Sequence, residues 1–186
     1  DPVRALGAPP ELRAAGAGNS DGFVNFETPH VHPIDISPNG LWLAACNTPD
    51  GRVEIYAINV STGALSFSSS VTVGVDPVSV RFRTNDELWA VNAISDSISI
   101  IDRTIAQVTD TIITYRLADT GSVLAGSPNG DRPMDVVFIN TGALAVVSCT
   151  RTDILQLYNA STRALLHESL RLDGEDRQRS VLAARA

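Results

Sequence analysis

The chain has 186 residues, a formal net charge of −7, 44% hydrophobic residues and 19% charged residues. This composition is typical of one globular domain with a sizeable core rather than a disordered chain. The acidic balance disfavours nucleic acid and anionic membrane surfaces, because both reward clustered Lys and Arg. No apolar run approaches the roughly 20 residues that span a bilayer.

The N-terminal part contains two expected segments. Residues 1–22 are rich in Ala, Gly and Pro and predict an extended arm. Residues 23–32 predict a latch strand, since Phe23–Glu27 alternates apolar and polar side chains. The first residue is Asp1 rather than Met, and no signal peptide is visible. A processed, exported protein is one explanation, and an incomplete chain is another.

The first repeated unit covers residues 33–76. Its proline, Pro33, opens a short alternating strand, and turns follow at Ser37–Gly40 and Thr48–Gly51. Pro presets φ in such turns, and Asn-Gly accepts a positive φ. Three further strands are expected, at residues 41–45, 53–56 and 70–73.

The second unit covers residues 77–132 and opens at Pro77. Its later strands are expected at residues 88–91 and 98–101. The spacing from Pro33 to Pro77 is 44 residues, and that from Pro77 to Pro133 is 56. We interpret the excess as an inserted loop over residues 115–129. Long loops on rigid scaffolds often carry function.

The third unit covers residues 133–175 and opens at Pro133. Strands at residues 144–147 and 155–158 repeat the pattern. Residues 176–186 form an expected C-terminal tail. Four short strands per unit of about 44 residues is the period of a β-propeller blade. The sequence therefore predicts an all-β fold, a β-propeller segment of about three four-stranded antiparallel blades.

The residue pattern of the units resembles the YVTN-type propeller repeat. The residues that carry the resemblance are Pro33, Ser37–Gly40, Asn47 and Ile55; Gly74, Pro77, Val91, Asn92, Ser97–Ile100 and Asp102; and Pro133, Asp135, Val147 and Asn159. Cys149 stands in the third unit where Asn47 and Asn92 stand in the others. The resemblance implies a secreted, periplasmic or surface-attached bacterial protein. Its members include surface-layer components, binding modules, lactonase-like enzymes and partners of redox-cofactor domains.

The number of units indicates an incomplete ring. Closed propellers have about 4 to 8 blades, and three are present here. Each blade needs neighbours to bury both of its faces. We therefore expect the arc to be part of a larger ring. Further blades of a longer chain, or a partner chain, would complete it.

Two groups of residues are candidate sites at the mouth of the central channel. His30 and His32 form a His-x-His pair whose imidazoles, on a strand, would point the same way toward a transition metal or haem iron. Asp76, Asp131 and Arg132 occupy equivalent loops and could bind a small ligand. Ordinary loop hydrogen bonds and solvated charges are the alternative interpretation of both groups.

No catalytic constellation is visible in the sequence. The serines lack a Gly-x-Ser-x-Gly setting, and the two cysteines, Cys46 and Cys149, match no zinc or CxxC pattern. We expect both cysteines to be small, apolar strand residues. The leading hypothesis is a non-enzymatic propeller scaffold or binding module for protein or surface assembly, with no cofactor. The alternative is a propeller subunit or fragment of an enzyme, either lactonase-like or part of a redox complex that docks a haem or quinone partner.

Overall fold

The computed structural model describes residues 29–114 and 131–169. This part of the chain consists of twelve strands, and it contains no helix. The expected arm, the strand at residues 23–27, the inserted loop and the C-terminal tail lie outside the described residues. The strands are β1 (Ile34–Ile36), β2 (Trp42–Asn47), β3 (Arg52–Ile58), β4 (Leu65–Thr72), β5 (Pro77–Phe82), β6 (Glu87–Asn92), β7 (Ser97–Asp102), β8 (Gln107–Ile113), β9 (Pro133–Ile139), β10 (Leu144–Cys149), β11 (Ile154–Asn159) and β12 (Leu165–Ser169).

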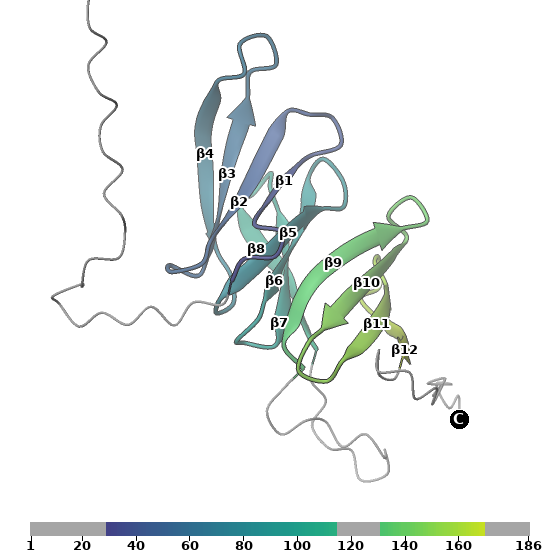
Figure 1. Cartoon of the computed structure of the whole chain (residues 1–186). Coiled ribbons are helices and arrows are strands. Elements are labelled where there is room, and N and C mark those ends of the chain that lie inside the picture. The colour runs from purple at the N-terminus through teal and green to yellow at the C-terminus, as the bar shows by residue number, and fades with distance from the viewer. Residues whose placement is uncertain (1–28, 115–130, 170–186) are drawn as a thin grey trace, which may run out of the picture.

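The strands form three separate four-stranded sheets, each an antiparallel meander of consecutive strands. We call them blade 1 (β1–β4), blade 2 (β5–β8) and blade 3 (β9–β12); Figure 1 shows them fanned about their first strands. The predicted all-β fold of three four-stranded antiparallel blades is confirmed. Within the described residues, no helix is long and apolar enough to cross a membrane.

Local sequence explains most of the strand ends. Gly40 and Gly51 have φ values of 72° and 61° in the first two hairpin turns, a conformation that side chains resist. The expected fourth strand at residues 70–73 is wrong in its start, because β4 begins at Leu65. The serine-rich stretch up to Ser70 obscures the strand in the sequence, but its residues pair with β3 from Ile58 onward.

Blade 2 is buried on both faces because it lies between the other two. One apolar cluster joins Ala44, Val53 and Ile55 of blade 1 to blade 2. Another joins Trp89, Val91, Ile98 and Ile100 of blade 2 to blade 3. The core therefore lies in two layers between blades, which is how propeller blades bury their sheets.

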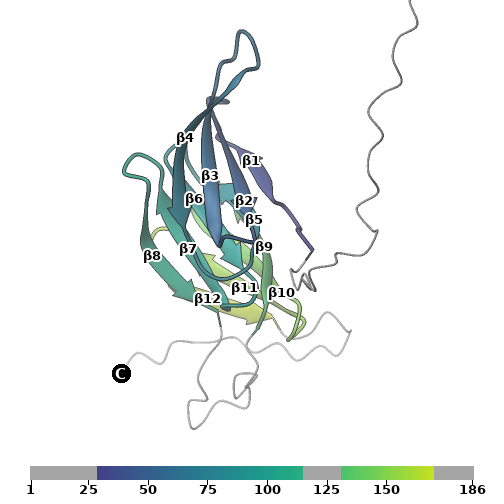
Figure 2. The same cartoon turned by 90° about the vertical axis from the view of Figure 1, so that its left-hand side faces the viewer.

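The outer faces of blades 1 and 3 remain apolar and open in the described structure. On blade 1, Ile34 is 57% exposed and Phe67 is 61% exposed, and Phe67 stacks edge-on against Tyr56. On blade 3, Val137 is 49% exposed. Figure 2 views the molecule from the side of blade 1. Contiguous exposed apolar side chains of this kind mark interaction surfaces.

Main-chain and side-chain bonds join the three inner strands. The His32 N–H donates to the carbonyl oxygen of Val78, and the Val80 N–H donates to the carbonyl of His32 at 2.9 Å. The Ser79 hydroxyl donates to the carbonyl of Met134 at 2.7 Å, so blade 2 is tied to both neighbours near the axis. These bonds fix the angle between adjacent blades at their inner ends.

Candidate functional site

The residues before the inner-strand prolines of blades 2 and 3 have an unusual backbone. Asp76 and Arg132 have φ values of 64° and 52°, which non-glycine residues seldom adopt. The conformation aims the Asp76 carbonyl at the Ala93 N–H (2.9 Å) and the Arg132 carbonyl at the Thr150 N–H (3.0 Å). The loop before the first strand of each of these blades is therefore bonded to the turn between the second and third strands of the same blade.

Arg132 lies in a junction between blades 2 and 3. Its N–H donates to Asp96 Oδ1 at 2.6 Å, and Arg151 Nη1 lies 3.8 Å from the same oxygen. The Asp96 carbonyl accepts from both the N–H and the hydroxyl of Thr114 at 2.9 Å. Asp96 therefore gathers groups from three separate segments of the chain.

A buried side-chain network continues from this junction. Gln156 is 1% exposed, and its Nε2 donates to the Thr114 carbonyl (3.1 Å) and to Asp131 Oδ2 (3.2 Å). The Tyr158 hydroxyl donates to Gln156 Oε1 at 2.7 Å. Thr114 and Asp131 are thus held together from blade 3. Networks of this kind rigidify a structure when every member is satisfied.

The predicted mouth residues fall at one end of the blades, but in two groups. Asp131 and Arg132 share the blade 2–blade 3 junction, whereas Asp76 packs at the start of β5 beside the blade 2 turn. Asp76 and Asp131 are 5% and 6% exposed. Their role toward a ligand stays a prediction.

His30 and His32 precede β1 and have different partners. His30 Nε2 lies 2.5 Å from Thr48 Oγ1, whose hydroxyl donates to the Pro77 carbonyl at 2.6 Å. His32 Nε2 lies 3.9 Å from Asp35 Oδ1. Over residues 29–114 and 131–169, no group of three or more His, Cys, Asp or Glu side chains is placed to hold a metal ion. The metal hypothesis for the pair stays a prediction.

Asn47 and Asn92 hold the turns between second and third strands. Asn47 Nδ2 donates to Asp50 Oδ2 (2.9 Å), and Asn92 Nδ2 donates to the Ser97 and Ser99 hydroxyls (3.1 and 3.0 Å). A Cβ added at Gly74 would lie 2.6 Å from Asn92 Nδ2, so only glycine fits there. The recurrent Asn and Gly of the repeat thus have a packing role.

At the opposite end of the blades, an arginine stacks on a tryptophan at each junction. The Arg103 guanidinium lies 3.9 Å from the ring centre of Trp42, and that of Arg163 lies 5.2 Å from the ring centre of Trp89. The two tryptophans are not at equivalent positions of their strands. Counted back from Asn47 and Asn92, the last paired residues of β2 and β6, Trp42 lies two residues further from the turn than Trp89 does.

Glu87 is the centre of the ion-pair cluster at the blade 2–blade 3 junction. It accepts from Trp89 Nε1 (2.8 Å), Arg83 Nη1 (3.0 Å) and Arg163 Nη2 (3.0 Å). Burial raises the pKa of Glu87, but the hydrogen bonds from Arg163, Trp89 and Arg83 outweigh it, so the pKa lies below its ordinary value. Glu87 therefore stays ionised at neutral pH.

The cysteines are unpaired and apolar in setting. Both are free. Burial raises the pKa of the Cys46 thiol to about 12. Burial also raises the pKa of Cys149, with a smaller contribution from the charges of Asp131, Glu168 and Asp96. Neither thiol is a reactive nucleophile in this environment.

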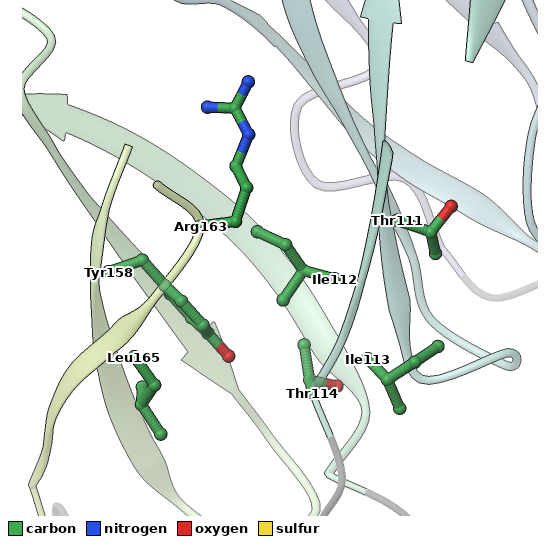
Figure 3. Close-up of a pocket in the computed structure, with 7 residues that line it drawn as sticks. All are labelled: Thr111, Ile112, Ile113, Thr114, Tyr158, Arg163 and Leu165. Atoms are coloured by element: carbon green, nitrogen blue, oxygen red, sulfur yellow. The ribbon is translucent and has the colours of Figure 1, made fainter. Parts of the chain in front are cut away.

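A cavity of about 290 Å³ lies between the outer strands of blades 2 and 3. Figure 3 shows β8 on one side of it and the side chains of blade 3 on the other. The lining residues are Thr111, Ile112, Ile113, Thr114, Tyr158, Arg163 and Leu165. The lining combines apolar side chains with the polar side chains of threonine, tyrosine and arginine.

Sequence reasoning missed Gln156, Tyr158, Glu87 and Arg163. One signal was present, because Gln156 stands at an inward position of an otherwise apolar alternating strand. A polar side chain at such a position needs buried partners. Nothing in the sequence indicates that Arg163 reaches the preceding blade.

The fold is similar to that of solved β-propeller proteins. It matches hydrazine synthase of Kuenenia stuttgartiensis with a TM-score of 0.61 at 19% identity, over 84% of this chain and 41% of that chain. It matches a proposed 6-phosphogluconolactonase from Bacteroides uniformis with a TM-score of 0.54 at 18% identity, over 74% and 40%. A further match is dihydro-heme d1 dehydrogenase NirN in complex with DHE, with a TM-score of 0.55 at 16% identity, over 78% and 29%.

The chain is therefore an arc of three β-propeller blades, and it spans about two fifths or less of the length of these structures. No protein-family model and no curated protein matches the sequence. Likeness at these identities shows the fold alone. The YVTN resemblance stays a prediction.

Proposed function

We propose that this chain is a non-enzymatic propeller scaffold of an exported bacterial protein. It acts in protein assembly by binding further blades on the outer faces of blades 1 and 3. The observation that carries the proposal is the contrast in burial between blades. Ile34 and Phe67 of blade 1 are more than half exposed, whereas Val78 and Val80 of blade 2 are fully buried.

The repeat supports the same chemistry for the missing neighbours. Val146, Leu155 and Leu157 on the outer face of blade 3 correspond in register to Trp89, Ile98 and Ile100, which pack on the next blade. A face that is built like a buried junction but lacks its partner favours association with another antiparallel blade. The partner is therefore a meander with its own apolar face, from a longer chain or a second polypeptide.

The test measures association and apolar exposure together. We expect the chain to bind an apolar dye strongly and to form species heavier than 19.7 kDa as concentration rises in sedimentation. Replacing Ile34→Glu and Ile36→Glu should reduce both, because charge on this face opposes burial. Ile105→Glu is the matched control, since Ile105 is 56% exposed in a turn and not on a blade face.

One result would overturn the proposal. A stably folded monomer of 19.7 kDa, with weak dye binding and no response to the face substitutions, would show that the outer faces need no partner.

A further inference from the structure

The outer edge of β8 is a free strand edge in the described structure. β8 ends the sheet order β5-β6-β7-β8, and no described strand pairs with its other side. The Thr114 N–H donates to the Asp96 carbonyl of the blade at 2.9 Å. Because antiparallel pairs alternate, the main-chain groups of Ile112 also face β7, whereas those of Thr111 and Ile113 face outward.

The composition of β8 does little to protect this edge. Natural edge strands carry Lys, Pro or bulges that block pairing with another chain. β8 has neither Lys nor Pro, and five of its seven residues are β-branched. The bulge in its pairing lies between Ile100 and Ile101 of β7, away from Ile113. One feature opposes strand pairing at this edge, because Asp110 Oδ1 accepts the outward N–H of Thr111 at 2.8 Å.

The cavity between blades 2 and 3 adjoins this edge. Four consecutive residues, Thr111 to Thr114, line it, although alternate side chains of a strand point to opposite faces. The cavity therefore borders the edge itself. Its far wall is Tyr158 and Leu165 of blade 3, as Figure 3 shows. A volume of about 290 Å³ admits one large apolar side chain.

The solvent-exposed charge beside the cavity is acidic. Arg163 lines the cavity, but Glu87 holds its guanidinium at 3.0 Å. The Asp110 side chain is 52% exposed and lies 3.9 Å from Arg163 Nε. A basic group next to Asp110 therefore meets a carboxylate that is still open to solvent.

We propose that β8 binds an extended peptide segment of a protein partner as an added strand. The segment pairs with the carbonyl of Thr111 and both main-chain groups of Ile113, inserts one apolar side chain into the cavity, and places a basic side chain beside Asp110. Strand addition obtains affinity from main-chain bonds and specificity from pockets for alternate side chains. The inference rests on the proposed binding role, but the peptide would bind the outer edge of β8 and its adjoining cavity, which we call the rim site, and not the outer faces of blades 1 and 3.

The probes are three fluorescent seven-residue peptides with an N-terminal lysine, alternating threonine and valine, and a central valine, leucine or phenylalanine. We expect saturable binding of at least one peptide, with new protection of the Ile113 amide from hydrogen exchange. Ile113→Pro removes an outward N–H but no bond to β7, a substitution that strand edges tolerate. It should weaken binding about tenfold through lost pairing.

Further variants keep the test independent of that one proline. Leu165→Ala in the cavity and Asp110→Asn at the edge should each weaken binding about threefold to tenfold, with circular dichroism unchanged. Ile105→Ser, in an exposed turn, is the control and should leave the affinity within about twofold, and Phe67→Ser tests whether the peptide binds the outer face of blade 1 instead.

Two outcomes would overturn the inference. The first is the absence of an effect at the edge. Either none of the three peptides protects the Ile113 amide, or the variants Ile113→Pro, Leu165→Ala and Asp110→Asn all bind as the native chain does. The other is loss of binding in Phe67→Ser with binding retained in the rim variants. That second result would place the peptide on the outer face, and would leave the proposed scaffold function standing while rejecting the rim site.

Discussion

The two junctions between blades are built differently although they join repeats of one design. The blade 1–blade 2 junction combines Ala44, Val53 and Ile55 packed on blade 2 with single directed bonds, such as that from the buried Thr48 hydroxyl to the Pro77 carbonyl. The blade 2–blade 3 junction adds a buried Gln156 network at one end and a Glu87 ion-pair cluster at the other. Apolar packing tolerates slippage more readily than a network of directed bonds. The second junction therefore depends more on buried polar and charged side chains than the first does.

The largest expected effect is at Gln156, in the second junction. Gln156→Leu leaves the Thr114 carbonyl, Asp131 Oδ2 and the Tyr158 hydroxyl without this partner in a buried site. We expect a loss of about 3 kcal/mol in the free energy of unfolding, measured by urea denaturation. Ser99→Ala is the matched control, because Ser99 has the same register in blade 2 and loses one bond to Asn92, at a cost of about 1 kcal/mol. Equal losses in both variants would contradict the comparison.

The next effect tests the first junction through sterics. In Gly74→Ala the new Cβ would lie 2.4 Å from Ser95 Oγ and 2.7 Å from Asn92 Cγ. Because Asn92 is fully buried and bonded, we expect a loss of about 2 kcal/mol, the usual cost of overpacking. Thermal unfolding measures it. A neutral result would mean that the turn beside Gly74 relaxes freely, and that the buried Asn92 does not restrict packing at this junction.

A smaller difference separates the two arginine–tryptophan stacks. Arg163→Met removes a bond to Glu87 and a stack on Trp89, and we expect a loss of about 1.5 kcal/mol. Arg103→Met removes a stack on Trp42 and an ion pair to the half-exposed Asp86, at a cost of about 0.5 kcal/mol. Urea unfolding of both variants in parallel provides the comparison. A larger loss for Arg103 than for Arg163 would reverse it.

The smallest effect is a pH dependence confined to the second junction. The folded pKa of Glu87 is lowered from its ordinary value of 4.5. Its contribution to stability is complete above that value and is lost as pH falls through the lower, folded pKa. We expect the melting temperature of the native chain to fall in this acidic window, and the fall to be shallower in Glu87→Gln. Identical slopes in the two proteins between pH 5 and pH 3 would show that Glu87 does not carry the dependence.

The sequence predicted the blades because their information is local. Alternating strands, Pro-opened units and turns such as Ser37–Gly40 are written in consecutive residues, and the structure confirms the three antiparallel sheets. The start of β4 was missed, because Leu65 to Ser70 is polar on one side and its pairing with β3 decides its conformation. Trp42 and Trp89 each follow a leucine in the sequence but are not equivalent in the structure, because strand register depends on the partner strand.

The candidate site divides in the same way. The sequence predicted a ligand site at Asp76, Asp131 and Arg132, and that role stays a prediction. Their partners were not predicted, because Asp96, Gln156 and Thr114 meet only through a long-range junction. The cavity beside β8 was equally hidden, since its walls come from two blades about 50 residues apart in the chain.

The sequence by itself determined the repeat, the strands and the apolar faces, because each of these depends on the period-2 alternation of neighbouring side chains. Only the tertiary structure decided which faces are buried, which polar groups meet and where an edge stays free. These properties depend on how one blade lies against the next, and side chains such as Gln156 and Arg163 contribute to that arrangement from positions far away in the chain.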